Sequence, residues 1–358
     1  MSTGAKRNGE IRGYKLTTMQ KIFNIYLVMA AIAISTCVSG VGYAIRPFFR
    51  ALSKPIIVEN SSQLKQALAT AKPGDSIILR DGVYDGKFVI EASVSGTSKQ
   101  PVVLTGSRNA ILDAGNNQTG YVLHLKASYW KLKGFTLQNG LKGIVTDGAN
   151  YNVIDGVLVT QLGEEGIHFR AFSKHNVIKN CEVTHTGKKS PGYGEAIYIG
   201  SAYSNWAKHS DGKPDQCDSN QVLNNKLGPY VAAECIDVKE GTTGGIIRGN
   251  TFEAQGITGA NSADSWIDVK GNHYLIEGNT GYNTQPSVLL DGYQVNCAYE
   301  GWGSYNKFKG NISHLNTDGY GINVRLKSAK GETVGNEVYA DNKVINAKGI
   351  TNIQLTNK

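Results

Sequence analysis

The sequence repeats one short passage: ECIDVKEGTTGGIIRGNTF at residues 234–252 returns as SWIDVKGNHYLIEGNT at residues 265–280. In both copies IDVK comes first, a glycine-containing turn follows, and a second apolar segment ends in GN. Asp237 and Asp268 are therefore equivalent positions, 31 residues apart. Self-similarity at such a spacing is typical of a solenoid, in which each repeat is one coil stacked on its neighbours.

Weaker copies of both segments extend the repeat over most of the chain. Those that resemble IDVK are YVLHLKAS, GIVTDG, GIHFRAF, AIYIGSA, GYQVNCA and GINVRLK. Those that resemble IIRGN are YWKLKGFTLQN, NVIDGVLVT, NVIKNCEVT, NQVLNNKLG and NKFKGNISH. Their period-two alternation and many β-branched residues indicate strands rather than helices. We therefore predict an all-β fold, a right-handed parallel β-helix, with the hand taken from the preference of parallel crossovers.

Two further features support this fold. Asparagines recur at one position of the second segments and are expected to stack in a ladder, namely Asn225, Asn250, Asn279, Asn311 and Asn342. The stretch SSQLKQALATA, residues 61–71, has the pattern of an amphipathic helix with Leu64, Leu68 and Ala69 on one side. Because the end of a β-helix exposes apolar surface, we expect this helix to cap it.

The net charge of +8 is concentrated at the N-terminus. Residues 1–54 contain eight Lys and Arg against Glu10 alone, which leaves the remainder near +1. A nucleic-acid partner is therefore not expected. Residues 22–38 form an apolar run, and small residues follow up to Ala44, as in an export signal.

The expected organisation has three parts. Residues 1–44 are a signal peptide or membrane anchor with an N-terminal extension, residues 45–54 a linker, and residues 55–358 a single β-helix domain. We expect a secreted monomer, or a membrane-anchored protein if residues 22–38 are not cleaved.

Outside the N-terminal segment the chain has four cysteines, of which Cys217 and Cys297 are the favoured disulfide pair. Sequons at Asn60, Asn117 and Asn311 predict a glycoprotein if the host is a eukaryote.

Aligning the IDVK-like segments places outward residues in columns, one residue per coil. The first column is His124, Val145, His168, Tyr198, Asp237, Asp268, Gln294 and Asn323. The second is Lys126, Asp147, Arg170, Gly200, Lys239, Lys270, Asn296 and Arg325. A third, at the start of the segments, is Glu165, Glu195, Glu234, Ser265 and Asp291, which can share the groove only if the chain bends there. Any one such residue is best explained as a solvated polar face, but charges gathered on neighbouring coils predict a functional site.

Three of these segments, GEAIYIG at 194–200, ECIDVKEGTTGGIIRGNTF and SWIDVKGNHYLIEGN, resemble the active coils of alginate lyases and chondroitinase-B-type lyases. GDSIILRDGVYDGKFVI at 74–90 also resembles their first coil, so the resemblance covers most of residues 55–315. It implies a β-helix of the pectin-lyase-like type and an enzyme that cleaves uronic-acid polysaccharides. It also implies that Lys239 removes the C5 proton and that Lys270 replaces an arginine that assists the leaving oxygen.

The resemblance implies calcium as well, held in that family by one asparagine and two glutamates. Glu234 matches the second glutamate, whereas the other two places are Gly192 and Ala232. Glu195, one coil earlier, is the other candidate ligand, and Asp237 with Asp268 offers a way to rebuild the site. Tyr198 stands where the family has an arginine.

The chemistry of β-elimination needs a base, neutralisation of the uronate carboxylate and a proton donor for the leaving oxygen. Lys239 and Lys270 are expected to lower each other's pKa, which would make one of them a base, unless the nearby acids outweigh this effect. Arg170, Arg325 or a metal would hold the carboxylate. Tyr198 or His168 would act as the acid.

Two other functions stay open at this point. A glycoside hydrolase on the same scaffold would use Asp237 and Asp268 as its two carboxyl groups. A non-catalytic carbohydrate-binding protein would keep the groove and have no turnover. In each case the partner is a polysaccharide. The insertion at residues 201–220 is expected to form a wall of the groove, held by Cys217.

Overall fold

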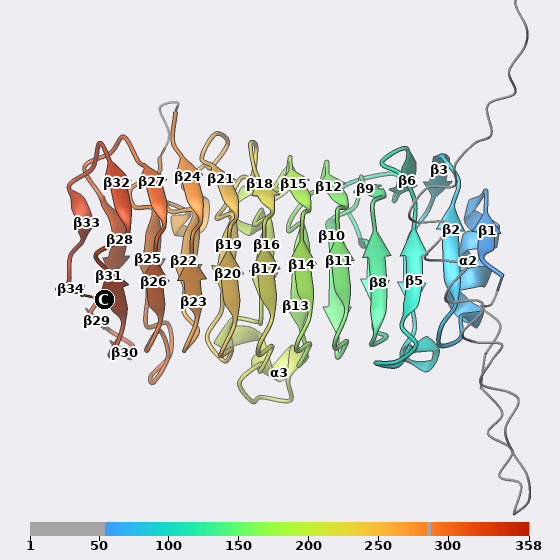
Figure 1. Ribbon diagram of the computed structural model, residues 1–358, viewed down its shortest axis with the longest axis horizontal. Helices are drawn as coiled ribbons and strands as arrows, with labels where there is room; N and C mark the ends of the chain where they lie inside the picture. Colours follow the sequence, from blue (N-terminus) through green and yellow to red (C-terminus); the bar gives the residue numbers. More distant parts are fainter. Residues whose placement is uncertain (1–53, 285–287, 358) are drawn as a thin grey trace, which may run out of the picture. The chain divides into compact units, whose positions relative to one another are not determined.

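The computed structural model describes residues 54–284 and 288–357. Figure 1 shows them as short strands stacked coil upon coil, from β1 (blue) to β33 and β34 (red). The predicted export segment, its cleavage point and all but the last residue of the linker lie outside the described residues. Within the described ranges, no helix is long and apolar enough to cross a membrane.

Each complete coil contributes one strand to each of three parallel sheets, which we call A, B and C. Sheet A contains β1 (Ile56–Val58), β2 (Ser76–Leu79), β5 (Val102–Thr105), β8 (Trp130–Lys133), β11 (Val153–Asp155), β14 (Val177–Lys179), β17 (Gln221–Leu223), β20 (Ile246–Arg248), β23 (Leu275–Glu277), β26 (Lys307–Lys309), β31 (Glu337–Tyr339) and β34 (Leu355–Thr356). Sheet B contains β3 (Gly82–Asp85), β6 (Ala110–Asp113), β9 (Thr136–Gln138), β12 (Leu158–Thr160), β15 (Glu182–Thr184), β18 (Lys226–Leu227), β21 (Thr251–Glu253), β24 (Thr280–Tyr282), β27 (Ile312–His314) and β32 (Lys343–Ile345).

Sheet C is built from the IDVK-like segments. Its strands are β4 (Phe88–Ile90), β7 (Tyr121–Leu125), β10 (Lys142–Asp147), β13 (Ile167–Arg170), β16 (Ile197–Ile199), β19 (Ile236–Val238), β22 (Ile267–Val269), β25 (Tyr293–Val295), β28 (Tyr320–Val324) and β33 (Gly349–Thr351). The IIRGN-like segments supply sheets A and B. The predicted parallel β-helix is therefore confirmed.

Short elements lie between the sheet strands. They are η1 (Ala92–Val94), η2 (Pro191–Tyr193), η3 (Tyr203–Asn205), α3 (Trp206–His209), η4 (Ala260–Ser262) and the antiparallel hairpin β29 (Lys327–Ser328) with β30 (Gly331–Glu332).

The core lies inside the coils because alternate strand residues point inward. Ile236 and Val238 of β19 stack on Ile267 and Val269 of β22, and all four are fully buried. Burying one such aliphatic side chain contributes about 1.5–3 kcal/mol. The same register leaves Asp237 and Asp268 on the outer face.

Helix α2 (Ser61–Thr70) packs against β1, β3 and β4 at the first coil, which confirms the predicted cap. It begins where the Asn60 side chain accepts a hydrogen bond from the backbone N–H of Gln63. Leu64, Ala67 and Leu68 are its buried residues. The assignment of Ala69 to the buried side is wrong, since that residue is exposed.

The asparagine ladder is present between sheets A and B. Each amide oxygen accepts the backbone N–H of the preceding ladder residue at 2.9–3.0 Å, and the order is Asn225, Asn250, Asn279, Asn311, Asn342. A second ladder that the sequence analysis missed joins Asn152, Asn176 and Asn220. Because Asn311 is buried in the ladder, its sequon cannot carry a glycan in the folded protein, and that prediction is wrong.

The cysteine pairing is also wrong. All four cysteines of the described β-helix are buried free thiols. Cys217 donates to Asp215 and Cys297 to the Tyr299 carbonyl. Adjacent coils are about 4.8 Å apart, and other coils lie between the two that carry Cys217 and Cys297. The distance between these cysteines therefore exceeds the Cα separation of a disulfide.

Candidate active site

The outer face of sheet C carries the first predicted column in register. Neighbouring strands pair Tyr198 with Asp237, Asp237 with Asp268, and Asp268 with Gln294. The second column continues the backbone hydrogen bonding of sheet C beyond the strand ends. The Lys239 N–H donates to the Ile199 carbonyl, and the Lys270 N–H donates to the Val238 carbonyl. Stacking thus brings the predicted lysines and aspartates onto adjacent coils.

These side chains form one continuous chain of ion pairs. Lys239 Nζ lies 2.5 Å from Asp237 Oδ2, and Lys270 Nζ lies 2.8 Å from Asp237 Oδ1. Lys270 Nζ also lies 2.5 Å from Asp268 Oδ2, whose other oxygen accepts a hydrogen bond from Asn296. Each lysine therefore has a carboxylate partner, and Lys270 links two.

The pKa values of these groups follow from the ion pairs. Burial alone would lower the pKa of Lys239 and of Lys270, but the Asp237 carboxylate outweighs burial and both pKa values lie above the usual range. Burial would likewise raise the pKa of Asp237, but the two ammonium groups hold it below its usual value. Lys239 does lower the pKa of Lys270, as expected, but the Asp237 carboxylate between the two lysines outweighs this effect, so neither lysine has the lowered pKa of a base.

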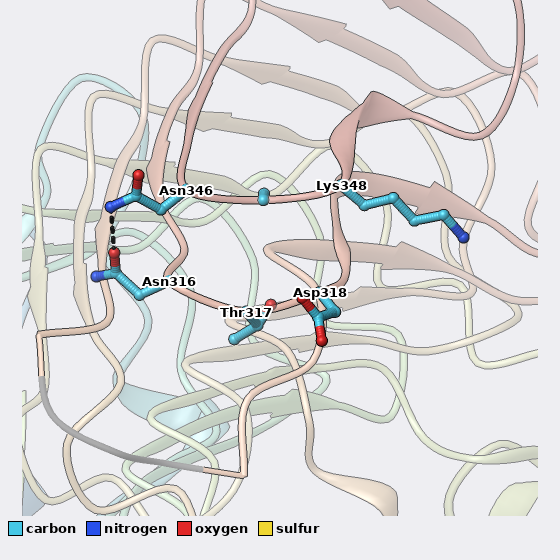
Figure 2. A pocket seen from close by; sticks show the side chains of 6 residues that line it. Asn316, Thr317, Asp318, Asn346 and Lys348 are labelled. Atoms are coloured by element: carbon cyan, nitrogen blue, oxygen red, sulfur yellow. Dashed lines mark hydrogen bonds between the residues drawn. The ribbon is translucent and has the colours of Figure 1, made fainter.

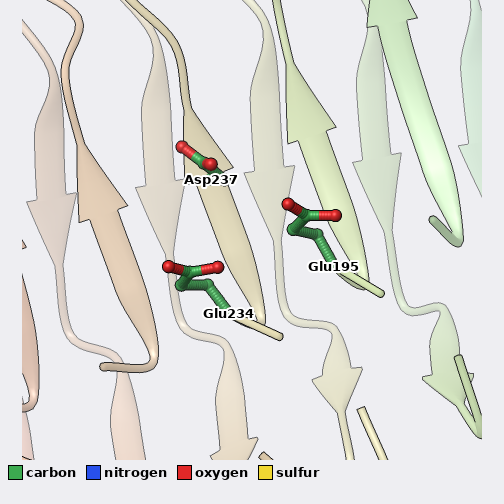
Figure 3. A group of neighbouring side chains, drawn as sticks. All are labelled: Glu195, Glu234 and Asp237. Atoms are coloured by element: carbon green, nitrogen blue, oxygen red, sulfur yellow. The ribbon is translucent and has the colours of Figure 1, made fainter. Parts of the chain in front are cut away.

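Two glutamates join this cluster from the starts of their strands. Glu195 and Glu234 precede β16 and β19, and Figure 3 shows both carboxylates beside Asp237. One carboxylate oxygen from each of the three lies within 4.8 Å of the others. The bend that the third column requires is therefore present at these two coils.

The two glutamates are buried, and neither forms an ion pair with another described residue. Burial, and then Glu165 and Asp237, raise the pKa of Glu195 well above its usual value, and its Oε2 has no hydrogen-bond partner among the described residues. Burial and Asp237 raise the pKa of Glu234 to about 8. Such a pair needs a proton or a cation to balance its charge.

The cluster fits a hard cation. Calcium is bound by oxygen ligands at about 2.3–2.6 Å, so two ligand atoms on opposite sides of it lie up to about 5 Å apart. The carboxylate oxygens of Glu195, Glu234 and Asp237 lie within this distance of one another. Glu195 Oε2, which has no hydrogen-bond partner among the described residues, is available as a ligand atom. Asp237 would have to share its oxygens with the lysines, while Gly192 and Ala232 contribute no side-chain ligand.

Tyr198 on β16 lies between His168 and Asp237 in the sheet. Its ring meets the His168 ring at 4.5 Å, and Lys239 Nζ lies 4.9 Å from its centroid. Burial, and then the Asp237 charge, raise the pKa of Tyr198 well above its usual value. The phenol therefore keeps its proton and can donate it.

His168 is a weaker candidate for the acid. Its Nε2 lies 2.9 Å from the Gly200 carbonyl oxygen, which can only accept, so Nε2 carries a proton that is already donated. Burial lowers the pKa of His168, which favours the neutral ring. The geometry thus favours Tyr198 over His168 as the proton donor.

The two predicted arginines lie in different places. Arg170 is 8% exposed, pairs with Asp147 at 2.6 Å and donates to the Tyr121 hydroxyl. It lines the same cavity as Tyr198. Arg325 follows β28, three strands beyond β19, and is exposed. At about 4.8 Å per strand the two coils are about 14 Å apart, so the structure does not bring Arg325 to the lysine–aspartate cluster.

The insertion at residues 201–220 lies beside the site, as predicted. Its anchor is Asp215, which is fully buried and accepts hydrogen bonds from the Ala171 and Phe172 N–H groups and from the Ser201 hydroxyl. Ala171 and Phe172 both have positive φ, a costly conformation that these bonds help to hold. A buried carboxylate therefore holds the insertion in place of the expected disulfide.

A separate hollow lies at the turns after β27 and β32 (Figure 2). Asn346 donates to the Asn316 side chain, which in turn donates to the Asn283 carbonyl. Asp318 and Lys348 also line it. These amides extend the turn-to-turn stacking of the coils, so we assign this hollow a structural role.

Three contributors to the site, Lys142, Tyr121 and Asp215, were not among the predicted residues, and Asp147 was predicted in the second column without its role. Lys142 neutralises Glu165, Tyr121 and Asp147 hold Arg170, and Asp215 anchors the insertion. Lys142 carried a signal that could have been used, since it is a charged residue at the start of a sheet C strand, one coil before Glu165. Asp215 carried none, because it lies in an irregular insertion.

The chain is similar in sequence and in structure to known β-helix proteins. A sequence family described as Pel9A-like, right handed beta helix region, matches residues 52–204. The crystal structure of an alginate lyase from Paenibacillus sp. str. FPU-7 is similar over 84% of this chain and 99% of that one, with 38% identity and a TM-score of 0.74. A rhamnogalacturonan lyase structure, at 12% identity, covers 82% of this chain and 87% of its own with a TM-score of 0.54, and shows the fold alone.

Pectate lyase L of Thermoclostridium stercorarium is 24% identical over 280 residues, or 71% of this chain. The chain spans 22% of the length of that curated relative. The right-handed coil and the lyase resemblance predicted from the sequence are thereby confirmed. By its identity to an enzyme that it covers almost completely, the chain belongs to the right-handed parallel β-helix polysaccharide lyases, a family of carbon–oxygen lyases.

Proposed function

We propose that this protein cleaves a uronic-acid-containing polysaccharide by β-elimination, with Lys239 as the base and Tyr198 as the acid. The observation that carries the proposal is their contact: the Lys239 ammonium lies 4.9 Å from the centre of the Tyr198 ring, in a cluster of buried carboxylates. The Paenibacillus neighbour, an alginate lyase, supports a uronate polymer as substrate.

The reaction begins with removal of the proton on C5 of the uronate by Lys239. The electrons of that C–H bond form the C4=C5 double bond while the bond from C4 to the glycosidic oxygen breaks. Only the free amine can accept the proton, and the Asp237 carboxylate holds Lys239 in the ammonium form. We therefore expect the rate to increase with pH through the alkaline range.

The glycosidic oxygen leaves with the proton of the Tyr198 phenol. The raised pKa of this tyrosine keeps the phenol protonated, so it has a proton to give to the leaving oxygen. The proton that Lys239 removes then returns to the phenolate through solvent.

The substrate carboxylate has to be neutralised for C5 to become acidic. Lys270 lies on the coil after Lys239 and is the nearest described cation to Asp237 besides Lys239 itself. A calcium ion held by Glu195, Glu234 and Asp237 would supply positive charge to the substrate carboxylate and offset the Asp237 charge beside Lys239. These three residues are the ones that we propose as cation ligands.

The hydrolase alternative is less well supported. It needs one carboxyl group that is protonated at working pH, but the pKa of Asp237 is held low by two lysines. Lys270 Nζ lies 2.8 Å from Asp237 Oδ1 and 2.5 Å from Asp268 Oδ2. These two carboxylate oxygens are therefore no farther apart than the sum of the two distances. An ammonium group between them takes the place that a sugar and a water would need.

We also propose that the protein is exported. The apolar run at residues 22–38, preceded by basic residues and followed by small ones, supports this proposal. A polysaccharide substrate outside the cell is consistent with such a location.

The test is the ultraviolet absorbance of the unsaturated uronate, measured with residues 45–358 on alginate, pectate, glucuronan and chondroitin-type polymers. We expect absorbance to increase with at least one polymer, to be lost in Lys239→Ala and to fall at least about 100-fold in Tyr198→Phe. Lys131→Ala, on the exposed side of β8, is the control for removal of a lysine. New reducing ends without this absorbance would support the hydrolase instead.

The cation is tested separately with a chelator. If Glu195, Glu234 and Asp237 hold calcium, chelation lowers both the activity and the unfolding temperature, and added calcium restores them. In Glu195→Gln the unfolding temperature is expected to be independent of calcium. A wild-type protein whose unfolding temperature does not respond to either treatment contradicts the cation site and leaves the lysine and tyrosine roles intact.

A further inference from the structure

A cavity of about 430 Å³ lies over β10, β13 and β16, next to the proposed acid. Its charged lining comes from two opposite sides. Lys142, Glu164 and Glu165 lie near the starts of the strands, whereas Arg170 and Lys208 lie at a strand end and on the insertion. A sugar ring in this cavity would therefore face an acidic side and a basic side.

The side near the strand starts carries a net negative charge. Lys142 Nζ lies 2.5 Å from the Glu165 carboxylate and 3.3 Å from that of Glu164, so one ammonium is shared between two carboxylates. Glu165 is 4% exposed, whereas the Glu164 side chain is 18% exposed and can be reached from the cavity. Ionised carboxylates only accept hydrogen bonds, so this side suits the hydroxyl groups of a sugar.

The opposite side has a cation that is not neutralised. Asp147 pairs with Arg170, but within the described residues no ion pair involves Lys208, which is exposed on α3. The neighbouring His209 is affected by this positive charge. Burial, and then Arg170 and Lys208, lower the pKa of His209 to about 4. The potential there is positive and suits an anionic group.

This basic side is held rigidly. Asp215 ties the start of the insertion to the turn after Arg170, through the Ser201 hydroxyl and the Ala171 N–H. The buried Trp206 at the start of α3 donates its indole N–H to the Ser201 carbonyl at 2.9 Å. Lys208 is therefore carried on a segment that is ordered before substrate binds, which reduces the entropic cost of binding.

We propose that this cavity holds the sugar next to the scissile bond, and that this sugar must itself be a uronate. Its carboxylate would be bound by Lys208 with Arg170, and its hydroxyls would donate to Glu164. This inference rests on the proposed function and specifies its substrate. The polymer carries uronates at adjacent positions, rather than uronates that alternate with neutral sugars.

The test compares Lys208→Ala with Lys213→Ala, which removes the same charge from an exposed position of the same insertion outside the cavity. Initial rates are measured on a homopolyuronate of defined length, and on the same polymer after part of its carboxylates has been reduced to neutral hydroxymethyl groups. We expect Lys208→Ala to raise KM on the homopolymer about five- to tenfold with kcat little changed. Lys213→Ala should match the wild type.

On cuts beside a reduced sugar, Lys208→Ala and the wild type should have the same KM, because the carboxylate that Lys208 binds is gone. Equal effects of the two lysine variants, or an equal loss on both polymers, would overturn the proposal. If no polymer is cleaved, the proposed function fails. The subsite is then decided by calorimetric binding of saturated polyuronate oligosaccharides, which Lys208→Ala should weaken and Lys213→Ala should not.

Discussion

The asparagine ladder and the outer face of sheet C are both columns of polar residues that repeat once per coil, yet they behave in opposite ways. Asn279 accepts hydrogen bonds from the ladder residue before it and donates to the one after it. Asp237, by contrast, lies in register with Asp268, a second carboxylate that it cannot hydrogen-bond when both are ionised. Amides are self-complementary and carboxylates are not. The repeat therefore stabilises one face, whereas the other face needs lysines.

The largest effect is expected from removing the lysine that links the two aspartates. In Lys270→Met, Asp237 keeps one ammonium partner and Asp268 loses its own, and both carboxylates remain almost buried. Breaking a buried pair in this way costs about 3–5 kcal/mol of the free energy of unfolding, measured by urea denaturation.

The matched control adds Asp268→Leu to that variant. Because the uncompensated carboxylate is then gone, much of the stability should return, whereas activity should not, since Lys270 is still missing. If the single variant is as stable as the wild type, the charged face does not depend on its lysines and the contrast with the ladder does not hold.

A smaller loss is expected in the ladder. Asn279→Ala leaves the Asn250 N–H and the Ile247 carbonyl without partners inside the protein. The cost is about 2–3 kcal/mol of the free energy of unfolding, with activity per folded molecule unchanged. Asn109→Ala, at an exposed turn, serves as the control and should change stability little. A loss of activity at full stability would contradict a purely structural ladder.

The next effect is a dependence of stability on pH, measured in the presence of chelator. The pKa of Glu234 is raised from its usual 4.5 to about 8, so between these values the folded protein holds a proton that the unfolded chain has released. The stabilisation is complete below about pH 4.5 and is lost as pH rises towards 8. The unfolding temperature of Glu234→Gln should therefore fall less over this interval than that of the wild type. Parallel curves would mean that Glu234 is ionised throughout.

The smallest effect is expected outside both columns. Arg248 pairs with Glu277 at 2.8 Å on the exposed side of sheet A, where the two side chains are 50% and 37% exposed. Arg248→Ala should cost less than about 1 kcal/mol, because solvent screens the pair. A loss as large as that of Asn279→Ala would show that surface pairs, and not the ladder, hold the coils together.

The regular part of this molecule could be predicted from the sequence. The period of two and the repeated IDVK fix which residues point outward, so the alignment of Tyr198, Asp237 and Asp268 was correct. The same logic placed Lys239 and Lys270 on adjacent coils. The hydrogen bonding across the columns could not be predicted in this way, so the sign of the lysine pKa shift was left open, and the position of Asp237 between the lysines decides it.

The irregular parts were less predictable. The insertion at residues 201–220 has no period, so its anchor at Asp215 and its contribution of Lys208 to the cavity had no signal in the pattern. The cysteines were misread for a related reason. Their pairing depends on distances between coils, and the number of coils between Cys217 and Cys297 is set by the fold rather than by their spacing in the chain.

Helix α2 has a consequence beyond closing the core. A stack of parallel strands can be extended by any other chain that offers the same pattern of N–H and carbonyl groups. Because Leu64 and Leu68 pack the helix against the first coil, the N-terminal end of the stack is covered and cannot pair with another chain. A chain cut after Thr70 would expose it, and identical copies would be free to add end to end. The ten residues of α2 thus prevent a fold whose strands stack as in a fibre from being extended at this end.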